Sequence, residues 1–245
     1  MSAATTTDTA GDKGCLMVAS IFTPIQGGSA TVYANLCRFA PPGKMVALAT
    51  RRHYQDGIEI PGWKEHDARC GFPIHRLDLL RPEMAPPPAN KLVSAWRYLT
   101  IDIPLRLKIV ATVRRLIREH GIGVICIGEL VSTAWLGEFC RRFFGVRMVL
   151  YVHGEEITQR LGAGSFGRRR GEHLRGADAV VAVSRFTRQA LIEQMGVRPE
   201  RICLIENGVD TWRFSPGPDD GALRARLRLV GKRLVVAVGR LVPRK

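Results

Sequence analysis

The sequence lacks several signals that would each identify a class of protein directly. It contains no apolar run near the roughly 18 residues that a membrane-spanning helix needs. Residues 1–14 have neither the basic start nor the apolar centre of a secretory signal. The G-x-G-x-x-G pattern of dinucleotide-binding loops is also missing, which argues against a nicotinamide-dependent dehydrogenase. We interpret residues 1–14 as a disordered leader on a cytoplasmic protein.

Cysteine is sparse, and its spacing does not indicate a metal site or a disulfide framework. The six cysteines include no C-x-x-C pair, and no histidine lies near them at metal-ligand spacing. We therefore expect reduced, structural thiols and no bound metal.

Acidic residues are outnumbered by basic ones. The chain has 37 lysines and arginines against 22 aspartates and glutamates, which gives a net charge of +15. Such an excess favours anionic partners, namely phosphorylated small molecules, acidic lipid surfaces or nucleic acid, although a genomic bias toward arginine would explain it equally well. We expect no specific nucleic acid, since no known module is recognisable and aromatic residues are not interleaved with the basic ones.

Apolar segments alternate with helical patterns along most of the chain. Strands are predicted at residues 15–22, 45–49, 74–80, 123–127, 147–152, 179–183 and 201–205. Strands that are apolar throughout and alternate with helices indicate a parallel sheet covered on both faces. We therefore predict an α/β, Rossmann-like fold.

One predicted helix, which starts at Pro104 and ends at Gly121, is both amphipathic and basic. Its apolar stripe is explained most simply by packing on the sheet, and contact with an anionic membrane surface is the alternative. Residues 51–73 are polar and irregular, and the triple proline at 86–88 indicates an exposed connection.

The character of the sequence changes after Glu206, where turn-forming residues become frequent. We assign residues 15–210 to one domain and residues 211–232 to a linker with a short arginine-rich helix. Residues 233–245 are predicted to begin a second, truncated domain, with a lone strand at 234–238.

Candidate ligand-binding residues follow the predicted strands, because ligands of open parallel sheets bind beyond the carboxyl ends of the strands. At Gly27 and Gly28, absent side chains would let backbone amides and a helix N-terminus approach a phosphate. The alternative is a tight turn that needs a positive φ. His153 can donate a hydrogen bond to a ligand or take a proton, or it can simply bond to a loop carbonyl.

Charged residues follow two of these strands. Glu155 and Glu156 come directly after the His153-Gly154 pair, and because neighbouring side chains diverge, at most one of them faces a site. Arg240 and Lys245 follow the last predicted strand and supply positive charge suited to phosphate oxygens.

Four segments of the chain, taken in order, resemble the family-4 glycosyltransferases of GT-B fold. They are PIQGGSATVYANL, VHGEE, VAVSRFTRQALIEQMGVRPERICLIENGVDTWRFSP and VVAVGRLVPRK. The third is the most specific, since Val-Ser, a helix, Gly-Val-x-Pro-x-Arg-Ile and Asn-Gly-Val-Asp follow at close spacing. The resemblance spans about residues 16–245.

This resemblance implies an enzyme that moves a sugar from a nucleotide diphosphate to an acceptor hydroxyl with retention, without a metal or other cofactor. It implies that Gly27 and Gly28 lie near the donor diphosphate and that Arg240 and Lys245 bind it. His153 would contact the transferred sugar and support the reacting centre as the catalytic residue. The implied partners are a nucleotide sugar, a carbohydrate or lipid-linked acceptor and, at the inner membrane face, peripheral contact with anionic lipid.

The chain departs from the family pattern after the strand that precedes Arg240. Family members continue with a whole C-terminal domain that holds the nucleotide pocket. We therefore expect residues 1–245 to correspond to the N-terminal, acceptor-side half of a GT-B architecture and to be inactive as an isolated chain. The alternative is a non-catalytic or split-enzyme subunit that binds an anionic lipid or carbohydrate acceptor.

Overall fold

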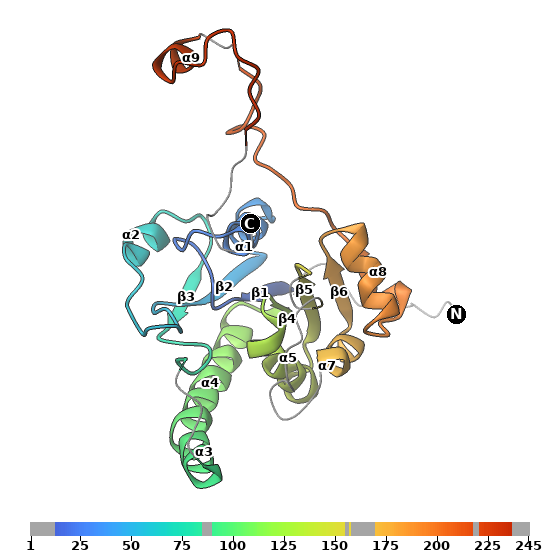
Figure 1. Cartoon of the computed structure of the whole chain (residues 1–245). Coiled ribbons are helices and arrows are strands. Elements are labelled where there is room, and N and C mark those ends of the chain that lie inside the picture. The colour runs from blue at the N-terminus through green and yellow to red at the C-terminus, as the bar shows by residue number, and fades with distance from the viewer. Residues whose placement is uncertain (1–12, 85–89, 155–156, 158–169, 218–220, 237–245) are drawn as a thin grey trace, which may run out of the picture. The chain divides into compact units, whose positions relative to one another are not determined.

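The structure of the chain is a computed structural model that describes residues 13–84, 90–154, 157, 170–217 and 221–236 (Figure 1). The chain divides into two compact units, Met1–Asn207 and Gly208–Lys245. The sheet and its covering helices all belong to the first unit.

The first unit is built on a seven-stranded sheet in which every neighbouring pair is parallel. The strand order is β3-β2-β1-β4-β5-β6-β7. The strands are β1 (Gly14–Val18), β2 (Met45–Thr50), β3 (Ile74–Leu77), β4 (Ile122–Ile127), β5 (Arg147–Val152), β6 (Ala179–Ala182) and β7 (Ile202–Leu204). The predicted parallel α/β, Rossmann-like fold is confirmed. The order reverses between β1 and β4, which is the point where such sheets bind ligands.

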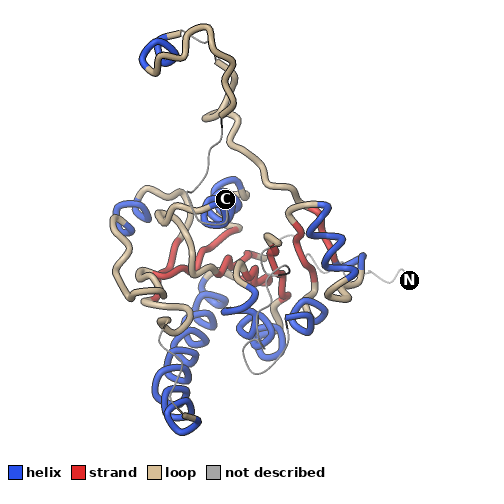
Figure 2. Tube along the Cα trace, viewed as in Figure 1, coloured by secondary structure: helices blue, strands red, loops and turns tan. Residues whose placement is uncertain are grey.

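Helices lie on both sides of this sheet (Figure 2). One side carries α1 (Gly28–Phe39), and the other carries α4 (Ile103–Glu119), α5 (Leu130–Phe144) and α7 (Arg170–Gly176). Along β1, Leu16 and Val18 pack into the core beneath α4 and α5, whereas Met17 packs into the core beneath α1. This alternation is the two-residue period of a strand, and it explains why the strand is apolar on both faces.

The predicted basic helix is longer than its apolar stripe indicates. A helix α3 (Lys91–Arg97) and a π-helical turn η1 (Tyr98–Asp102) lead directly into α4. Ile109, Val113 and Leu116 of α4 are buried on the sheet, so the packing interpretation is correct for α4. Neither α3 nor η1 contains a buried residue. Sequence patterning missed them because no core face imposes a helical period there.

Local signals at helix ends agree with the structure. Ser184 caps α8 (Arg185–Glu193), where its Oγ accepts a hydrogen bond from the Thr187 amide at 3.1 Å. Gly196, three residues after the end of this helix, has a φ of +66°. Helix α2 (Trp63–Ala68) lies in the segment 51–73 that was expected to be irregular.

The described residues of the second unit contain one helix, α9 (Ala222–Arg226), which lies within the linker where a short arginine-rich helix was expected. The strand predicted at 234–238 is not formed over residues 234–236, where Val235 and Val236 are exposed. A strand needs a neighbour to pair its backbone, and the described residues of this unit contain no other strand. Arg240 and Lys245 lie outside the described residues.

All six cysteines are free thiols. Burial raises the pKa of Cys37 and of Cys140 to about 12, so both thiols stay protonated at neutral pH. Over the part of the chain that the structure describes, no helix is long and apolar enough to cross a membrane.

Candidate functional site

The two glycines predicted to approach a phosphate lie where the loop after β1 enters α1. Gly27 has an extended backbone, with φ 175° and ψ 152°, and Gly28 is the first residue of the helix. The alternative that this pair needs a positive φ is therefore wrong. A Cβ atom added at either position would meet no heavy atom within 4 Å. Neither backbone strain nor packing among the described residues requires glycine here.

The N-terminus of α1 is left open to an anion. No side chain caps it, and its first turn contains no acidic residue. Its first helical hydrogen bond runs from the Thr31 amide to the Gly27 carbonyl at 3.0 Å, so the three preceding amides have no carbonyl to bond within the helix. Asn90 and Ser184, in contrast, cap α3 and α8 with their side chains. The amides without a helical partner and the helix dipole give this end partial positive charge.

His153 directly follows β5 and is half-buried. Its Nε2 atom lies 2.9 Å from the hydroxyl oxygen of Tyr33, which belongs to α1 and is 1% exposed. The helix that begins at Gly28 therefore also carries the residue that holds His153. The structure thus brings together two sites that the sequence predicted separately.

The hydrogen bonds of Tyr33 determine the tautomer of His153. The Tyr33 hydroxyl donates its single proton to the Gly128 carbonyl at 2.5 Å. Nε2 of His153 must therefore be the donor in the bond to the Tyr33 oxygen. In the neutral imidazole the other nitrogen, Nδ1, is then an acceptor, and it becomes a donor only when the ring is protonated.

Tyr33 is held in place by close packing. Its ring meets that of Tyr151 edge to face at 5.8 Å between centroids, and its ring centroid lies 5.4 Å from that of His153. A Cβ atom on Gly128 would lie only 2.7 Å from the Tyr33 ring, so this approach requires glycine at 128. The sequence analysis missed Tyr33, although it lies within the PIQGGSATVYANL segment.

Glu129 is a second residue of this edge that sequence patterning missed. Its Oε1 accepts a hydrogen bond from the Ile21 amide at 2.8 Å, and its Oε2 accepts one from the Ser132 hydroxyl at 2.9 Å. One carboxylate thereby ties the loop after β1 to the first turn of α5.

Arg76, at the end of β3, braces the same loop from the other side. Its side chain is 2% exposed, and its Nε donates to Asp67 Oδ2 at 2.6 Å. The guanidinium also donates to the carbonyls of Thr50, the last residue of β2, and of Thr23, in the loop after β1. An arginine inside a predicted strand was the available signal, because a buried guanidinium needs a carboxylate and several carbonyls around it.

The remaining predicted residues are not positioned by the structure. Arg240, Lys245, Glu155 and Glu156 all lie outside the described residues. Among the residues that are described, no group of three His, Cys, Asp or Glu side chains could hold a metal ion.

The sequence of the chain matches a known family. Residues 73–213 match the model of Glycosyltransferase Family 4. The chain belongs to this family. The sheet and helices also match the GT-B fold of solved glycosyltransferases.

Two relatives are described as GDP-mannose-dependent alpha-(1-6)-phosphatidylinositol monomannoside mannosyltransferases. The protein of Mycolicibacterium smegmatis is 32% identical over 241 residues, which are 94% of this chain and 53% of the relative. The protein of Mycobacterium tuberculosis H37Rv is 31% identical over 241 residues, which are 94% of this chain and 54% of the relative. The chain thus spans about half the length of the curated relatives it matches.

Two solved structures share the fold at low sequence identity. Anabaena Alr3699/HepE in complex with UDP and glucose is 19% identical, with a TM-score of 0.55 over 88% of this chain and 50% of that protein. Sucrose-phosphate synthase from Thermosynechococcus elongatus is 17% identical, with a TM-score of 0.56 over 89% of this chain and 53% of that protein.

Proposed function

We propose that the chain forms the acceptor-side half of a hexosyltransferase that moves a sugar from a nucleoside diphosphate to an acceptor hydroxyl with retention. The proposal rests above all on helix α1, whose uncapped end lies at Gly28 and whose Tyr33 holds His153. Membership of glycosyltransferase family 4 supports sugar transfer as the chemistry.

The donor diphosphate binds at the N-terminus of α1 in this proposal. Gly27 and Gly28 let the diphosphate approach the unpaired amides of the first turn, and Arg240 and Lys245 add positive charge. Negative charge grows on the departing nucleoside diphosphate as the sugar–phosphate bond breaks. Preorganised amides and cations stabilise that charge more strongly in the transition state than in the bound donor.

His153 acts on the transferred sugar. The Tyr33 hydroxyl holds the imidazole through Nε2, and in this proposal the ring contacts the transferred sugar and so orients the reacting carbon. Tyr33 is a positioning residue, because it acts through the histidine. The nucleotide sugar is a co-substrate, and the proposal includes no further cofactor.

The named relatives support GDP-mannose as the donor and a lipid-linked glycan as the acceptor. Peripheral contact with an anionic membrane fits the exposed apolar side chains Leu92, Trp96 and Leu99 of α3 and η1. The helical stretch 91–119 carries seven basic and two acidic residues. Salt-sensitive sedimentation with anionic vesicles, but not with oligonucleotides, tests this contact.

The alternative is a non-catalytic or split-enzyme subunit that binds an anionic lipid or carbohydrate acceptor. For residues 1–245 taken alone we expect no sugar transfer, since the relatives are about twice as long. Turnover of GDP-mannose by this polypeptide alone would contradict that expectation. Capture of a separate partner chain that restores turnover would favour the split-enzyme alternative.

A chimera tests the main proposal. Residues 1–245 replace the matching half of the M. smegmatis relative, and the product of GDP-mannose turnover is analysed by NMR for its anomeric configuration. We expect transfer with retention, and His153→Ala should lower kcat on the order of 10²-fold to 10³-fold.

The glycine variants sharpen this test. Gly27→Val should raise the KM for GDP-mannose, because the new side chain occupies the space for the diphosphate. Gly71→Val is the matched control, since Gly71 also lacks a positive φ and a Cβ there would meet nothing within 4 Å. A chimera that binds GDP but leaves GDP-mannose unreacted would refute the proposed function.

A further inference from the structure

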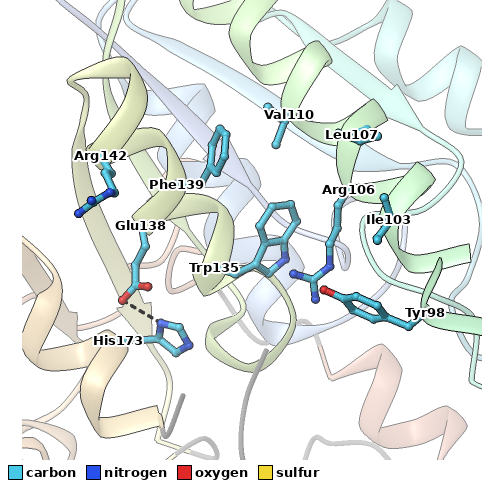
Figure 3. A pocket seen from close by; sticks show the side chains of 10 residues that line it. All are labelled: Tyr98, Ile103, Arg106, Leu107, Val110, Trp135, Glu138, Phe139, Arg142 and His173. Carbon is cyan, nitrogen blue, oxygen red and sulfur yellow. Dashed lines mark ion pairs between the residues drawn. The ribbon is translucent and has the colours of Figure 1, made fainter. Parts of the chain in front are cut away.

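A largely apolar pocket lies between α4 and α5, on the other side of the sheet from α1. Its volume is about 540 Å³. Its apolar walls come from Ile103, Leu107, Val110, Trp135 and Phe139 (Figure 3). Helix pairs in protein cores normally fill the space between them, and a space of this volume lies in the roughly 300–1,000 Å³ range of small-molecule sites.

The polar groups of this pocket are mainly cationic. The guanidinium carbon of Arg106 lies 4.6 Å from the Trp135 ring centroid and 6.0 Å from that of Tyr98, and Figure 3 shows it between the two rings. The one acidic side chain that lines the pocket, Glu138, lies 3.1 Å from Nδ1 of His173. This arrangement presents a guanidinium beside an apolar space, which suits a phosphate that is attached to a hydrocarbon chain.

A smaller pocket of about 150 Å³ shares Arg106 and Trp135 with the first. Its lining adds polar side chains, including Arg81 and Ser132. Ser132 donates to Glu129, the residue that ties α5 to the loop after β1 at the candidate site. The two pockets are therefore adjacent. The larger one is apolar, Arg106 lies where they meet, and the smaller one extends toward Ser132 near the carboxyl edge of the sheet.

The helix that lines the large pocket continues into exposed apolar surface. Tyr98 and Ile103 line the pocket, while Leu99 and Ile101, next to them on the same helical stretch, are exposed. Exposed apolar and aromatic side chains flanked by basic residues are typical of helices that lie in a membrane interface. This continuity favours a lipid over a soluble metabolite as the occupant.

We propose that the pocket between α4 and α5 binds one acyl chain of an anionic phospholipid, with the lipid phosphate on Arg106. The exposed apolar residues of α3 and η1 enter the interface and bring the pocket to the lipid. The polar head then extends past Ser132 toward the candidate site. The proposal rests on the proposed function only in taking this lipid to be the sugar acceptor.

Calorimetric titration of the 245-residue chain with monomeric dioctanoyl phosphatidylinositol tests the pocket. We expect one lipid per chain and about tenfold weaker binding of dioctanoyl phosphatidylcholine. Val110→Trp and the more exposed Leu107→Trp fill the pocket and should each weaken binding by at least about tenfold, the effect of excluding about two methylene groups. Ile58→Trp adds the same ring at an exposed position outside the pocket and should leave lipid binding unchanged. Thermal unfolding checks that each variant is folded.

Three results would overturn the pocket proposal. They are no lipid binding to the parent chain, lipid binding to both pocket-filling variants that is as tight as to the parent, or binding of deacylated glycerophosphoinositol that is as tight as that of the lipid. Dimerisation that both variants abolish, without lipid binding, would instead assign the pocket to a second copy of the chain. If lipid binds but the chimera transfers no mannose, only the proposed function fails. If the chimera is active and the pocket-filling variants change neither lipid binding nor the acceptor KM, only the pocket proposal fails.

Discussion

Removing the hydroxyl of Tyr33 is the most direct test of how the candidate site is held together. Tyr33→Phe keeps the ring in the core but takes the donor from the buried Gly128 carbonyl and the acceptor from Nε2 of His153. Loss of a partner for a buried carbonyl costs about 1–3 kcal/mol, and the half-buried bond to the imidazole adds about 0.5–1 kcal/mol. We therefore expect the free energy of unfolding to fall by about 2–3 kcal/mol.

Urea denaturation of residues 1–245 measures this change. The midpoint should fall without a change in the m-value, because the variant exposes the same surface on unfolding. For a unit of this size a loss of about 2 kcal/mol lowers the melting temperature by about 4–8 °C. Tyr98→Phe is the matched control, since Tyr98 is exposed, and it should stay within about 0.5 kcal/mol of the parent.

The same variant tests the tautomer of His153. Nitrogen-15 chemical shifts of its imidazole should show protonated Nε2 in the parent and a mixture of tautomers in Tyr33→Phe. The reasoning would be refuted if Tyr33→Phe unfolded at the same urea concentration as the parent. It would also be refuted if the parent carried its proton on Nδ1.

Three further predictions concern the stability of the first unit. Arg76→Leu should lower the free energy of unfolding by about 3–5 kcal/mol, because it takes the buried guanidinium away from the half-buried Asp67 and from two backbone carbonyls. A smaller loss in urea denaturation would contradict this. Gly154→Ala should lower the free energy of unfolding by about 1–3 kcal/mol, since φ at Gly154 is +103°. Urea denaturation measures this loss, and an unchanged midpoint would contradict it. Burial lowers the pKa of His75 from its ordinary 6.5, and His120, whose Nε2 lies 3.3 Å from Nε2 of His75, lowers it further. Near this pH the unfolded chain therefore binds more protons than the folded chain, and the free energy of unfolding should fall as the pH drops through 6.5. His75→Gln should flatten that slope between pH 7.5 and 5.5, and an unchanged slope would assign it to other groups.

How much the sequence could predict differs between the strands and the helices. Buried parallel strands such as Met45–Thr50 and Arg147–Val152 were located because both of their faces are apolar, and this gives a continuous signal. The helix Lys91–Arg97 was missed because it has no buried face, and its apolar residues show no core periodicity. Over residues 234–236, the described part of the strand expected at 234–238, no strand is formed, and the described residues of this unit offer no neighbouring strand. A local apolar run cannot report the absence of such a neighbour.

Residues of the candidate site divide in the same way. Gly27, Gly28 and His153 were found because they follow predicted strands, where ligands of such sheets bind. Tyr33 was missed because an aromatic residue at helical spacing looks like core, and in part it is. The role of its hydroxyl depends on His153, which lies 120 positions away in the chain.

The sequence by itself determined the parallel α/β fold and, through four ordered segments, the resemblance to glycosyltransferase family 4. Both conclusions rest on patterns among residues that are close in the chain, where strand and helix periodicities arise. Only the tertiary structure decided that α1 has an uncapped N-terminus and also carries Tyr33, which holds His153. It also decided that α4 and α5 leave an apolar pocket beside Arg106. Those features depend on strand order and on the distance between packed helices, and a periodicity along the chain encodes neither.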